Sequence, residues 1–475
     1  MTDEAAQSQL KRFGYAQELL RSMGGFSNFA ISFSIISVLT GVFSTYKIAI
    51  QAAGPAGLGL GWPIVCAGTL VVSLAMAELA SAFPTAGALY HWSALLGGPA
   101  AGWMVAATNL VGQVAIVAAI DFACAKALQS TLSLGDAMRL PLFFAIIATH
   151  AVINLRSIRL VAWLNDFSAT VHVVGVVVLV ALLAMFGRAQ PLSFLGRGGF
   201  TMRDDHVYWL GFLNALTLGM WTMTGFDASA HASEETHDPE RRAPRGIVSS
   251  VAVSAVAGYL LICAITLAIR DLPKVAADDD PALAILRGAL GERAGRVAMG
   301  AAIVAMWFCG LSSVTSASRT FYAFARDDGL PLSRIIRRVN PRFKTPPPAI
   351  AMAVFLPCML VAVTSRFSDA VFDAVTSLAT TALYLSYGAP IALGVVSRVR
   401  TKWTRFGPFR LGRAGVPIAC AAVAYCAFVL VCFAIPPNQI YGEVIAGVVA
   451  VIVVAYLLFA RGRFRGPKID LGALE

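Results

Sequence analysis

Long apolar runs separated by short polar segments fill almost the whole chain. A helix that crosses a lipid bilayer needs about 20 predominantly apolar residues. At that length the sequence predicts about twelve such helices, at 27–50, 61–83, 100–127, 140–155, 160–186, 208–233, 246–269, 297–324, 347–364, 368–394, 415–434 and 440–460. Clusters of proline and glycine, such as those at 53–57 and 346–348, mark several of their ends. The pattern predicts an all-α integral membrane protein.

The predicted helix at 208–233 changes character near its middle. Its first part is apolar, but Thr222, Thr224, Gly225 and Asp227 then follow one another closely. An ionisable side chain at the centre of a membrane helix costs at least about 2.5 kcal/mol, so it usually serves a function. We expect the helix to open at Gly225 and to leave backbone groups free for a ligand. The alternative is a kinked packing helix in which neighbouring helices satisfy Asp227.

A second interrupted helix lies in the first half of the chain. Residues 34–42 combine Ser, Thr and Gly with apolar residues at mid-span. Helices interrupted at corresponding positions of two halves indicate a transporter site near the bilayer midplane. We therefore expect a transport core at 27–394, made of inverted repeats at about 27–186 and 208–394. Outside the core we expect a cytoplasmic N-terminal segment at 1–26, two further helices at 395–460 and a cytoplasmic tail at 461–475.

Composition supports a membrane protein and its charge predicts an orientation. The 475 residues are 58% hydrophobic and only 13% charged, which is too apolar for a soluble chain. The net charge of +11 comes mainly from Lys and Arg between helices on one side. By the positive-inside rule that side is cytoplasmic and holds both termini, so these residues indicate topology rather than nucleic-acid binding. Residues 1–21 lack an apolar signal sequence, and we expect a cell membrane, in particular a bacterial inner membrane.

Enzyme motifs are not recognisable in the sequence. The eight cysteines sit in apolar runs at irregular spacing, which matches no metal site or disulfide framework. No glycine-rich phosphate loop followed by a lysine is found, so ATP is not expected to drive transport. A nucleophile with a neighbouring base is not recognisable either. We expect no enzymatic activity, no cofactor, no metal and no obligate protein partner.

Three motifs resemble those of one transporter family. Residues 78–90 are similar to the signature after the second helix of amino acid–polyamine–organocation (APC) permeases, and residues 318–331 to the motif after the eighth. The stretch 225–236, with Ala243 to Arg245 after it, resembles the amino acid/choline/gamma-aminobutyrate branch. The resemblance covers about the whole membrane region. It implies a LeuT-type fold, a five-plus-five inverted repeat in which helices 1 and 6 are broken around the substrate.

The resemblance places the substrate between the two broken helices. Backbone N–H groups at the start of a half-helix bind anions, and carbonyl groups freed in helix 6 would receive an ammonium group. Where the family has a glycine-rich break in helix 1, this chain keeps only Gly41, so a face of small packing residues is the alternative there. Aromatic rings near the break would also attract a cation. The expected site residues are Ser37, Leu39, Thr40, Gly41, Gln113, Trp221, Thr222, Thr224, Gly225, Phe226 and Asp227.

Two polar residues of the predicted helices, Gln113 and Asp227, allow more than one interpretation. Gln113 either lines the site or joins helices by a hydrogen bond. Asp227 attracts a cationic substrate, senses a proton, or locks its helix through a hydrogen bond. Asp121, two turns beyond Gln113, is expected near the outer mouth with Lys126.

Predicted helix 5 bears on the source of energy. His172 stands where many sodium-independent family members have a lysine, and histidine titrates near neutral pH. We therefore expect His172 to act as a protonatable substitute for the ion, or else as a neutral hydrogen-bonding residue that does not titrate. In sodium-coupled relatives, hydroxyl groups at the positions of Ser312 and Ser313 complete a cation site.

Charged residues at the inner end of helix 6 predict a gate. Histidine and glutamate here could be taken for metal ligands, but their spacing matches no strong zinc pattern. We expect a cytoplasmic network instead, formed by Glu78, Glu234, Glu235, Arg245 and Arg319.

These observations predict secondary-active transport across the membrane. The expected substrate is an amino acid or a gamma-aminobutyrate-like zwitterion, driven by protons or by exchange and occluded beneath Trp221 or Phe226. A permease for polyamines, choline or another organic cation is the alternative, favoured if Asp227 faces the substrate. A substrate sensor or a channel is a weaker alternative. The expected partners are the small solute, a proton and membrane lipid, without nucleic acid.

Overall fold

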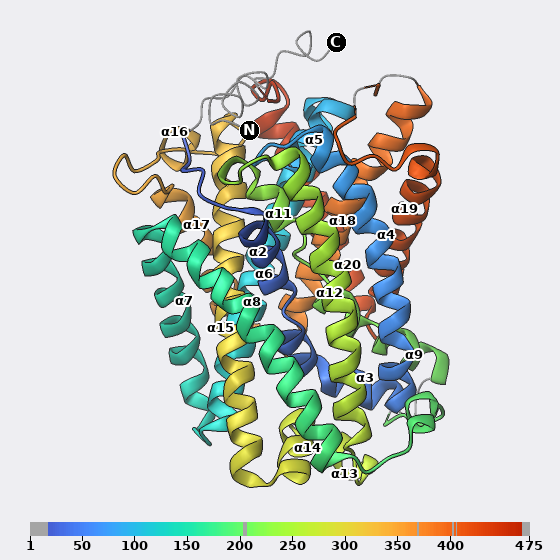
Figure 1. The fold of residues 1–475 in the computed structure, drawn as a ribbon. Coiled ribbons are helices and arrows are strands. Elements are labelled where there is room, and N and C mark those ends of the chain that lie inside the picture. The colour runs from blue at the N-terminus through green and yellow to red at the C-terminus, as the bar shows by residue number, and fades with distance from the viewer. Residues whose placement is uncertain (1–17, 203–206, 368–369, 401–402, 405, 468–475) are drawn as a thin grey trace.

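The computed structural model describes residues 18–202, 207–367, 370–400, 403–404 and 406–467. It is a bundle of helices (Figure 1), and eleven helices in the described residues are long and apolar enough to cross a membrane. This confirms the predicted all-α membrane class. The predicted terminal segments 1–26 and 461–475 fall largely outside the described residues.

The bounds of the helices follow the predicted apolar runs closely. The long helices are α2 (Gly25–Ile36), α3 (Val38–Gly59), α4 (Gly61–Ala82), α6 (Pro99–Thr131), α7 (Arg139–Arg156), α8 (Ile158–Leu182), α12 (Pro239–Leu267), α15 (Glu292–Arg326), α17 (Pro347–Phe367), α18 (Val371–Val399), α19 (Gly415–Cys432) and α20 (Gln439–Ala455). The shorter ones are α5 (Leu89–Gly97), α9 (Tyr208–Ala215), α10 (Thr217–Thr222), α11 (Ala228–His231), α13 (Leu272–Ala277), α14 (Pro281–Leu290) and α16 (Ser333–Ile336). Single turns lie at η1 (Asp136–Met138), η2 (Leu183–Gly187), η3 (Leu192–Gly196), η4 (Ser233–Glu235), η5 (Gly412–Ala414) and η6 (Tyr456–Ala460).

The first membrane span is broken at Ser37. Helix α2 ends at Ile36, Ser37 has a left-handed backbone with φ +31°, and α3 begins at Val38. The Ser37 hydroxyl accepts a hydrogen bond from the Thr40 N–H at 3.3 Å, which caps the start of α3. A serine that serves as an N-cap thus defines where the second half of the span begins.

The predicted span at 208–233 is broken more deeply. It consists of α9, α10 and α11, with the non-helical residues 223–227 between the last two. Gly225 has φ +88°, and a Cβ atom there would lie 2.1 Å from Ile35 Cγ2. The chain therefore needs glycine at this position, both for its backbone conformation and for its contact with α2. This segment accounts for the difference between about twelve predicted spans and eleven continuous ones.

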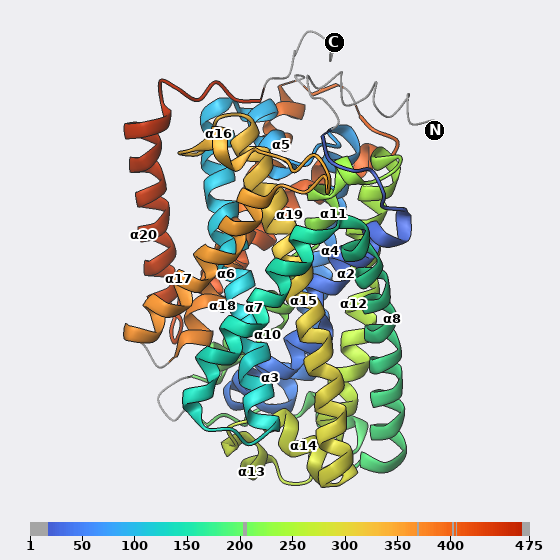
Figure 2. The ribbon, with the colours of Figure 1, turned by 90° about the vertical axis from the view of Figure 1, so that its left-hand side faces the viewer.

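The two broken spans lie inside the bundle. Helix α6 packs against α18 and α15, and α2 packs against α12, α8 and α15. Helices α7, α17 and α20 lie on the outside, with α20 at one edge (Figure 2). Large apolar side chains such as Trp163, Val177, Phe355 and Val451 are exposed on α8, α17 and α20. Such an apolar exterior suits contact with lipid. The five-plus-five repeat remains a prediction.

Candidate functional site

A small cavity lies where the two breaks meet. It measures about 10 Å³, close to the size of one water molecule. Gly41 allows the two broken spans to approach closely, since a Cβ atom there would lie 2.2 Å from the Thr222 side chain. Among the described residues no charged side chain lines this central cavity. Its lining consists of Ile35, Ile36, Thr40, Gly41, Ile116, Ile120, Trp221, Thr222, Thr224 and Cys309.

Helix ends face this cavity from both broken spans. The start of α3 carries partial positive charge, and the ends of α2 and α10 carry partial negative charge. At the end of α2, the Ile35 carbonyl accepts a hydrogen bond from Cys309 Sγ at 3.1 Å. At the end of α10, the Trp221 carbonyl accepts one from Thr224 Oγ1 at 2.7 Å. Backbone dipoles of both signs therefore surround a cavity that has no side-chain charge.

Asp227 lies behind the cavity as the centre of a buried hydrogen-bond network. Its Oδ1 accepts from the Tyr387 hydroxyl at 2.7 Å, and its Oδ2 lies 3.2 Å from both Gln113 Nε2 and His231 Nε2. The Tyr387 oxygen in turn accepts from the Gly225 N–H at 3.2 Å. Asp227 therefore holds the opened backbone in place, and it does not line the cavity.

His231 connects this network to the turn between α4 and α5. Its Nδ1 lies 3.1 Å from the Ala86 carbonyl, while its Nε2 faces the Asp227 carboxylate. Thr320 Oγ1 of α15 also lies 3.4 Å from Nδ1, so His231 contacts three parts of the chain.

His172 contacts the break in the first span directly. Its Nδ1 lies 2.8 Å from the Ser168 carbonyl, so this nitrogen carries the proton. Its Nε2 then accepts from the Ser37 hydroxyl at 2.7 Å, and Ser37 Oγ also lies 2.5 Å from Thr40 Oγ1. The ring thus reaches the cavity residue Thr40 through one hydroxyl group.

The predicted site residues separate into groups in the structure. Thr40, Gly41, Trp221, Thr222 and Thr224 line the central cavity. Ser37 and Gly225 form the two breaks, while Gln113, Phe226 and Asp227 lie behind them; the Phe226 ring packs 4.9 Å from that of Tyr387. Leu39 approaches Gly175 of α8 instead. Ser312 donates to Asn165 and Ser313 to the Cys309 carbonyl, and neither hydroxyl forms a hydrogen bond with α2 or α3 in the described structure.

One end of the bundle is closed by polar contacts between α2 and α11. Ser32 Oγ donates to the Phe226 carbonyl at 2.9 Å. Asn28 Nδ2 donates to the Ser229 carbonyl at 2.9 Å, and Ser229 Oγ donates to the Asn28 carbonyl at 2.8 Å. Figure 1 shows α11 near the end of the bundle that also holds α5 and α16. We call this the basic end, because Arg334, Arg337 and Arg338 follow one another there.

Buried ion pairs lie beyond these contacts at the basic end. Arg319 contacts Glu235 at 2.9 Å and Arg326 contacts Glu234 at 2.7 Å. Burial alone would raise the pKa of Glu234, but the Arg326 guanidinium holds that pKa below its usual range. These two pairs join η4 to α15.

The network predicted for the cytoplasmic gate agrees only in part with the ion pairs of the structure. Glu78 pairs with Arg398 of α18, apart from the other acids. Arg245, which we expected in this network, does not join it. Its side chain is exposed and makes no ion pair within the described residues. Arg326, which was not predicted, pairs with Glu234 instead. It lies two helical turns after Arg319, and that spacing places both guanidinium groups on one face of α15.

Asp121 also differs from its predicted position. It is fully buried and lies 3.2 Å from His150 Nδ1, between α6 and α7, instead of near the outer mouth. Helix α6 continues to Thr131, about one turn past the predicted end of the span at residue 127.

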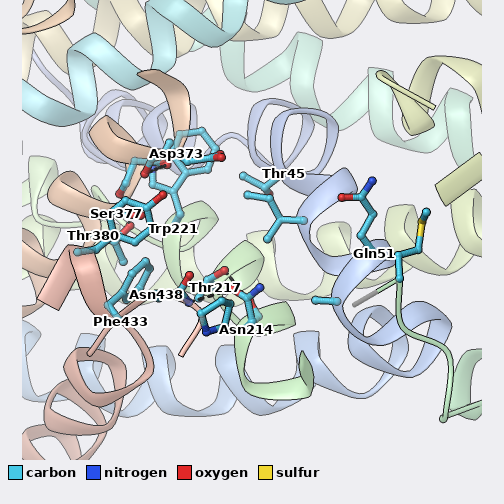
Figure 3. Close-up of a pocket in the computed structure, with 16 residues that line it drawn as sticks. Thr45, Gln51, Asn214, Thr217, Trp221, Asp373, Ser377, Thr380, Phe433 and Asn438 are labelled. Atoms are coloured by element: carbon cyan, nitrogen blue, oxygen red, sulfur yellow. Dashed lines mark hydrogen bonds between the residues drawn. The ribbon is translucent and has the colours of Figure 1, made fainter. Parts of the chain in front are cut away.

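A larger cavity of about 490 Å³ is lined by the second half of α3 and the start of α18, away from the basic end. Figure 3 shows the residues that line it. We call it the outer cavity. Trp221 lines both cavities and separates them, and its ring packs edge-on against Phe372 with centroids 5.7 Å apart. The structure is thus closed at the basic end and more open on the other side.

Comparisons with known proteins agree with this architecture. Residues 23–458 match the model of the amino acid permease family. The chain is 35% identical to the amino-acid permease BAT1 of Arabidopsis thaliana, over 98% of this chain and 96% of that protein. It is 33% identical to a BAT1 homolog of Oryza sativa (98% and 96%) and 27% identical to a GABA-specific permease of Saccharomyces cerevisiae (97% and 86%). These relatives are from plants and a fungus, so they do not support the expected bacterial membrane. The chain belongs to the amino acid permease family.

Proposed function

We propose that this permease carries a zwitterionic amino acid or a gamma-aminobutyrate-like solute through the central cavity by secondary-active transport. The observation that supports it is the uncharged cavity at two helix breaks. A carboxylate group would bind the N–H groups at the start of α3, and an ammonium group the carbonyl groups at the ends of α2 and α10. Ile35, Ile36, Ile116 and Ile120 would contact an aliphatic chain between them.

The position of Asp227 bears on the alternative of an organic cation. Three hydrogen bonds occupy the carboxylate, and it does not line the central cavity. A cationic solute in that cavity would lack a counter-ion, which favours a solute carrying both charges. The similarity to a GABA-specific permease supports the same substrate class.

Transport requires the closed end to open. In the proposed cycle, solute enters from the outer cavity, passes Trp221 and binds between the breaks, where the central cavity of about 10 Å³ widens to admit it. Helices α2 and α11 then separate, which breaks the Asn28–Ser229 contacts. Movement of η4 away from α15 breaks the Glu235–Arg319 pair. With the basic end in the cytoplasm, as the positive-inside rule predicts, this direction is uptake.

Uptake into liposomes tests the proposed function. Purified protein would be reconstituted and given labelled amino acids, gamma-aminobutyrate, putrescine or choline, with unlabelled solute inside or absent. We expect saturable uptake of a zwitterion that internal solute accelerates, as a carrier requires. Uptake of putrescine or choline alone would contradict the proposal.

We also propose that His172 carries the coupling proton. A protonated ring would donate from Nε2 to Ser37 Oγ, whose own hydrogen would then turn to Thr40 Oγ1. Protonation would thereby reverse the hydrogen bonds at the start of α3, beside the cavity.

His172→Gln tests this role, because glutamine keeps hydrogen-bonding capacity but does not titrate. We expect an inward proton gradient to stimulate wild-type uptake and to leave uptake by the variant unchanged. The measurement is initial uptake with and without the gradient, with uptake driven by internal solute as the control for folding. Equal stimulation in the variant would remove His172 from coupling and would direct attention to the Asp227–His231 pair.

A further inference from the structure

The outer cavity has a feature that passage of solute does not by itself require. Asp373 is the only carboxylate among the described residues that line it. This side chain is partly exposed, and among the described residues nothing donates a hydrogen bond to it or forms an ion pair with it. Removing a carboxylate from water without a partner is costly. The cavity therefore holds an acceptor that suits a cationic group.

Neighbouring cations of the protein do not supply that partner. Lys126 and Lys47 lie within electrostatic range of Asp373, but neither forms an ion pair with it in the described structure. Lys47, however, is paired with Asp279 at 3.0 Å. Asp373 lies in the first turn of α18, where the helix dipole stabilises a negative charge without providing a counter-ion.

The floor of the outer cavity offers a second unpartnered group. Trp221 is 5% exposed, and its indole N–H has no hydrogen-bond partner in the described structure. In Figure 3 Asn214, Thr217 and Asn438 lie together on one side of the cavity, apart from Asp373. Asn438 Nδ2 donates to Asn214 Oδ1 at 2.9 Å, which fixes these two amides. Pockets for small molecules combine such a few placed polar groups with apolar walls.

We propose that the outer cavity is a second binding site, which takes the primary ammonium group of the transported solute with Asp373 as its counter-ion. The proposal rests on the proposed function, because it assumes a solute with an amine. The outer cavity, with a volume of about 490 Å³, accommodates a whole amino acid. The solute binds here before Trp221 moves and admits it to the central cavity. The outer site requires only the amine, whereas the central one requires both charged groups.

Protection of a cysteine in the cavity tests the proposal without the need for transport. Ser377 lines the outer cavity, and Ser377→Cys places a thiol there with little change in size. The purified variant would react with the neutral reagent methyl methanethiosulfonate, and mass spectrometry would follow the reaction. Wild type gives the background from native thiols such as the exposed Cys420. Thr217→Cys serves as a second reporter if Ser377→Cys does not fold.

The probes are gamma-aminobutyrate, n-butylamine and butyrate. The two amines should slow labelling about tenfold at about ten times their dissociation constant, because the free fraction falls as 1/(1 + [L]/Kd). Butyrate should not protect, and Asp373→Asn should abolish protection by both amines. Protection by butyrate, or protection that survives Asp373→Asn, would overturn the proposal.

Uptake measured on the same preparations separates the two proposals. Uptake of gamma-aminobutyrate without amine protection would overturn the outer site and leave the proposed function intact. Amine protection without uptake of any zwitterion would support the outer site and count against the proposed function.

Discussion

Gly225→Ala should weaken solute binding by about tenfold or more, since each 1.4 kcal/mol of distortion costs a factor of ten. Gly225 has φ +88°, and an alanine held there costs about 1 to 3 kcal/mol in backbone strain. The new methyl group would also lie 2.1 Å from Ile35 Cγ2. Because Ile35 lines the central cavity, relief of this overlap moves the cavity wall.

The measurement is the dissociation constant of the transported solute, with thermal stability of the purified protein recorded beside it. Gly175→Ala on α8 is the matched control, since its Cβ atom would meet Leu39 only at 3.5 Å. The double variant Gly225→Ala/Ile35→Ala should recover part of the stability, because it removes the overlap but keeps the backbone strain. If Gly225→Ala bound solute as tightly as Gly175→Ala does, the break would not shape the site.

Tyr387→Phe should be the second most damaging single change. It leaves both the Gly225 N–H and Asp227 Oδ1 without their buried partner, at about 1 to 3 kcal/mol for each unsatisfied group. The ring remains to pack against Phe226, so the loss reports the hydroxyl group alone. We expect lower thermal stability together with weaker solute binding, because the opened backbone loses its anchor.

Tyr384→Phe is the control for that prediction. Tyr384 lies one turn earlier on α18 and is also fully buried, and its hydroxyl lies 3.2 Å from Thr69 Oγ1. Its hydroxyl forms no hydrogen bond with either break in the described structure, so its removal should lower stability slightly without changing solute binding. Equal effects of the two variants on binding would show that Asp227 and Tyr387 do not hold the site.

Local properties of the sequence predicted the fold and the places where it opens. Each span needs only a run of apolar residues, and the breaks followed from Gly225 and from the hydroxyl-rich stretch around Ser37. Each of these two signals can be recognised within its own segment of the chain. The same kind of reasoning found the hydroxyl groups Thr40, Thr222 and Thr224 that line the cavity.

Contacts between distant helices were harder to predict. Tyr387 lies 160 residues from Asp227, and only the rotation of α18 about its axis brings the two together. Hydropathy does not fix that rotation, so Asp227 kept several interpretations until its partners were located. The prediction that Asp121 lies near the outer mouth failed for a related reason. An apolar run does not show where a long helix leaves the bilayer.

Charged partners at the basic end illustrate a third limit. The sequence offers many arginines near Glu234 and Glu235, and burial decides which of them pair. Arg245 lies close in sequence but points to solvent, whereas Arg319 and Arg326 are buried on one face of α15. Their helical spacing was a usable signal, because it places two guanidinium groups opposite two adjacent glutamates.

The most direct test of whether an uncharged cavity selects a zwitterion compares the accumulation of labelled solutes that share a four-carbon chain and differ in their charged groups. Gamma-aminobutyrate, n-butylamine and butyrate would be compared in liposomes containing wild type, Asp227→Asn or Gly225→Ala. We predict that wild type accumulates only gamma-aminobutyrate, because only this solute matches helix ends of both signs, and that Gly225→Ala largely abolishes its accumulation. Accumulation of n-butylamine by wild type, lost in Asp227→Asn, would contradict the account and make Asp227 the counter-ion of a cationic substrate.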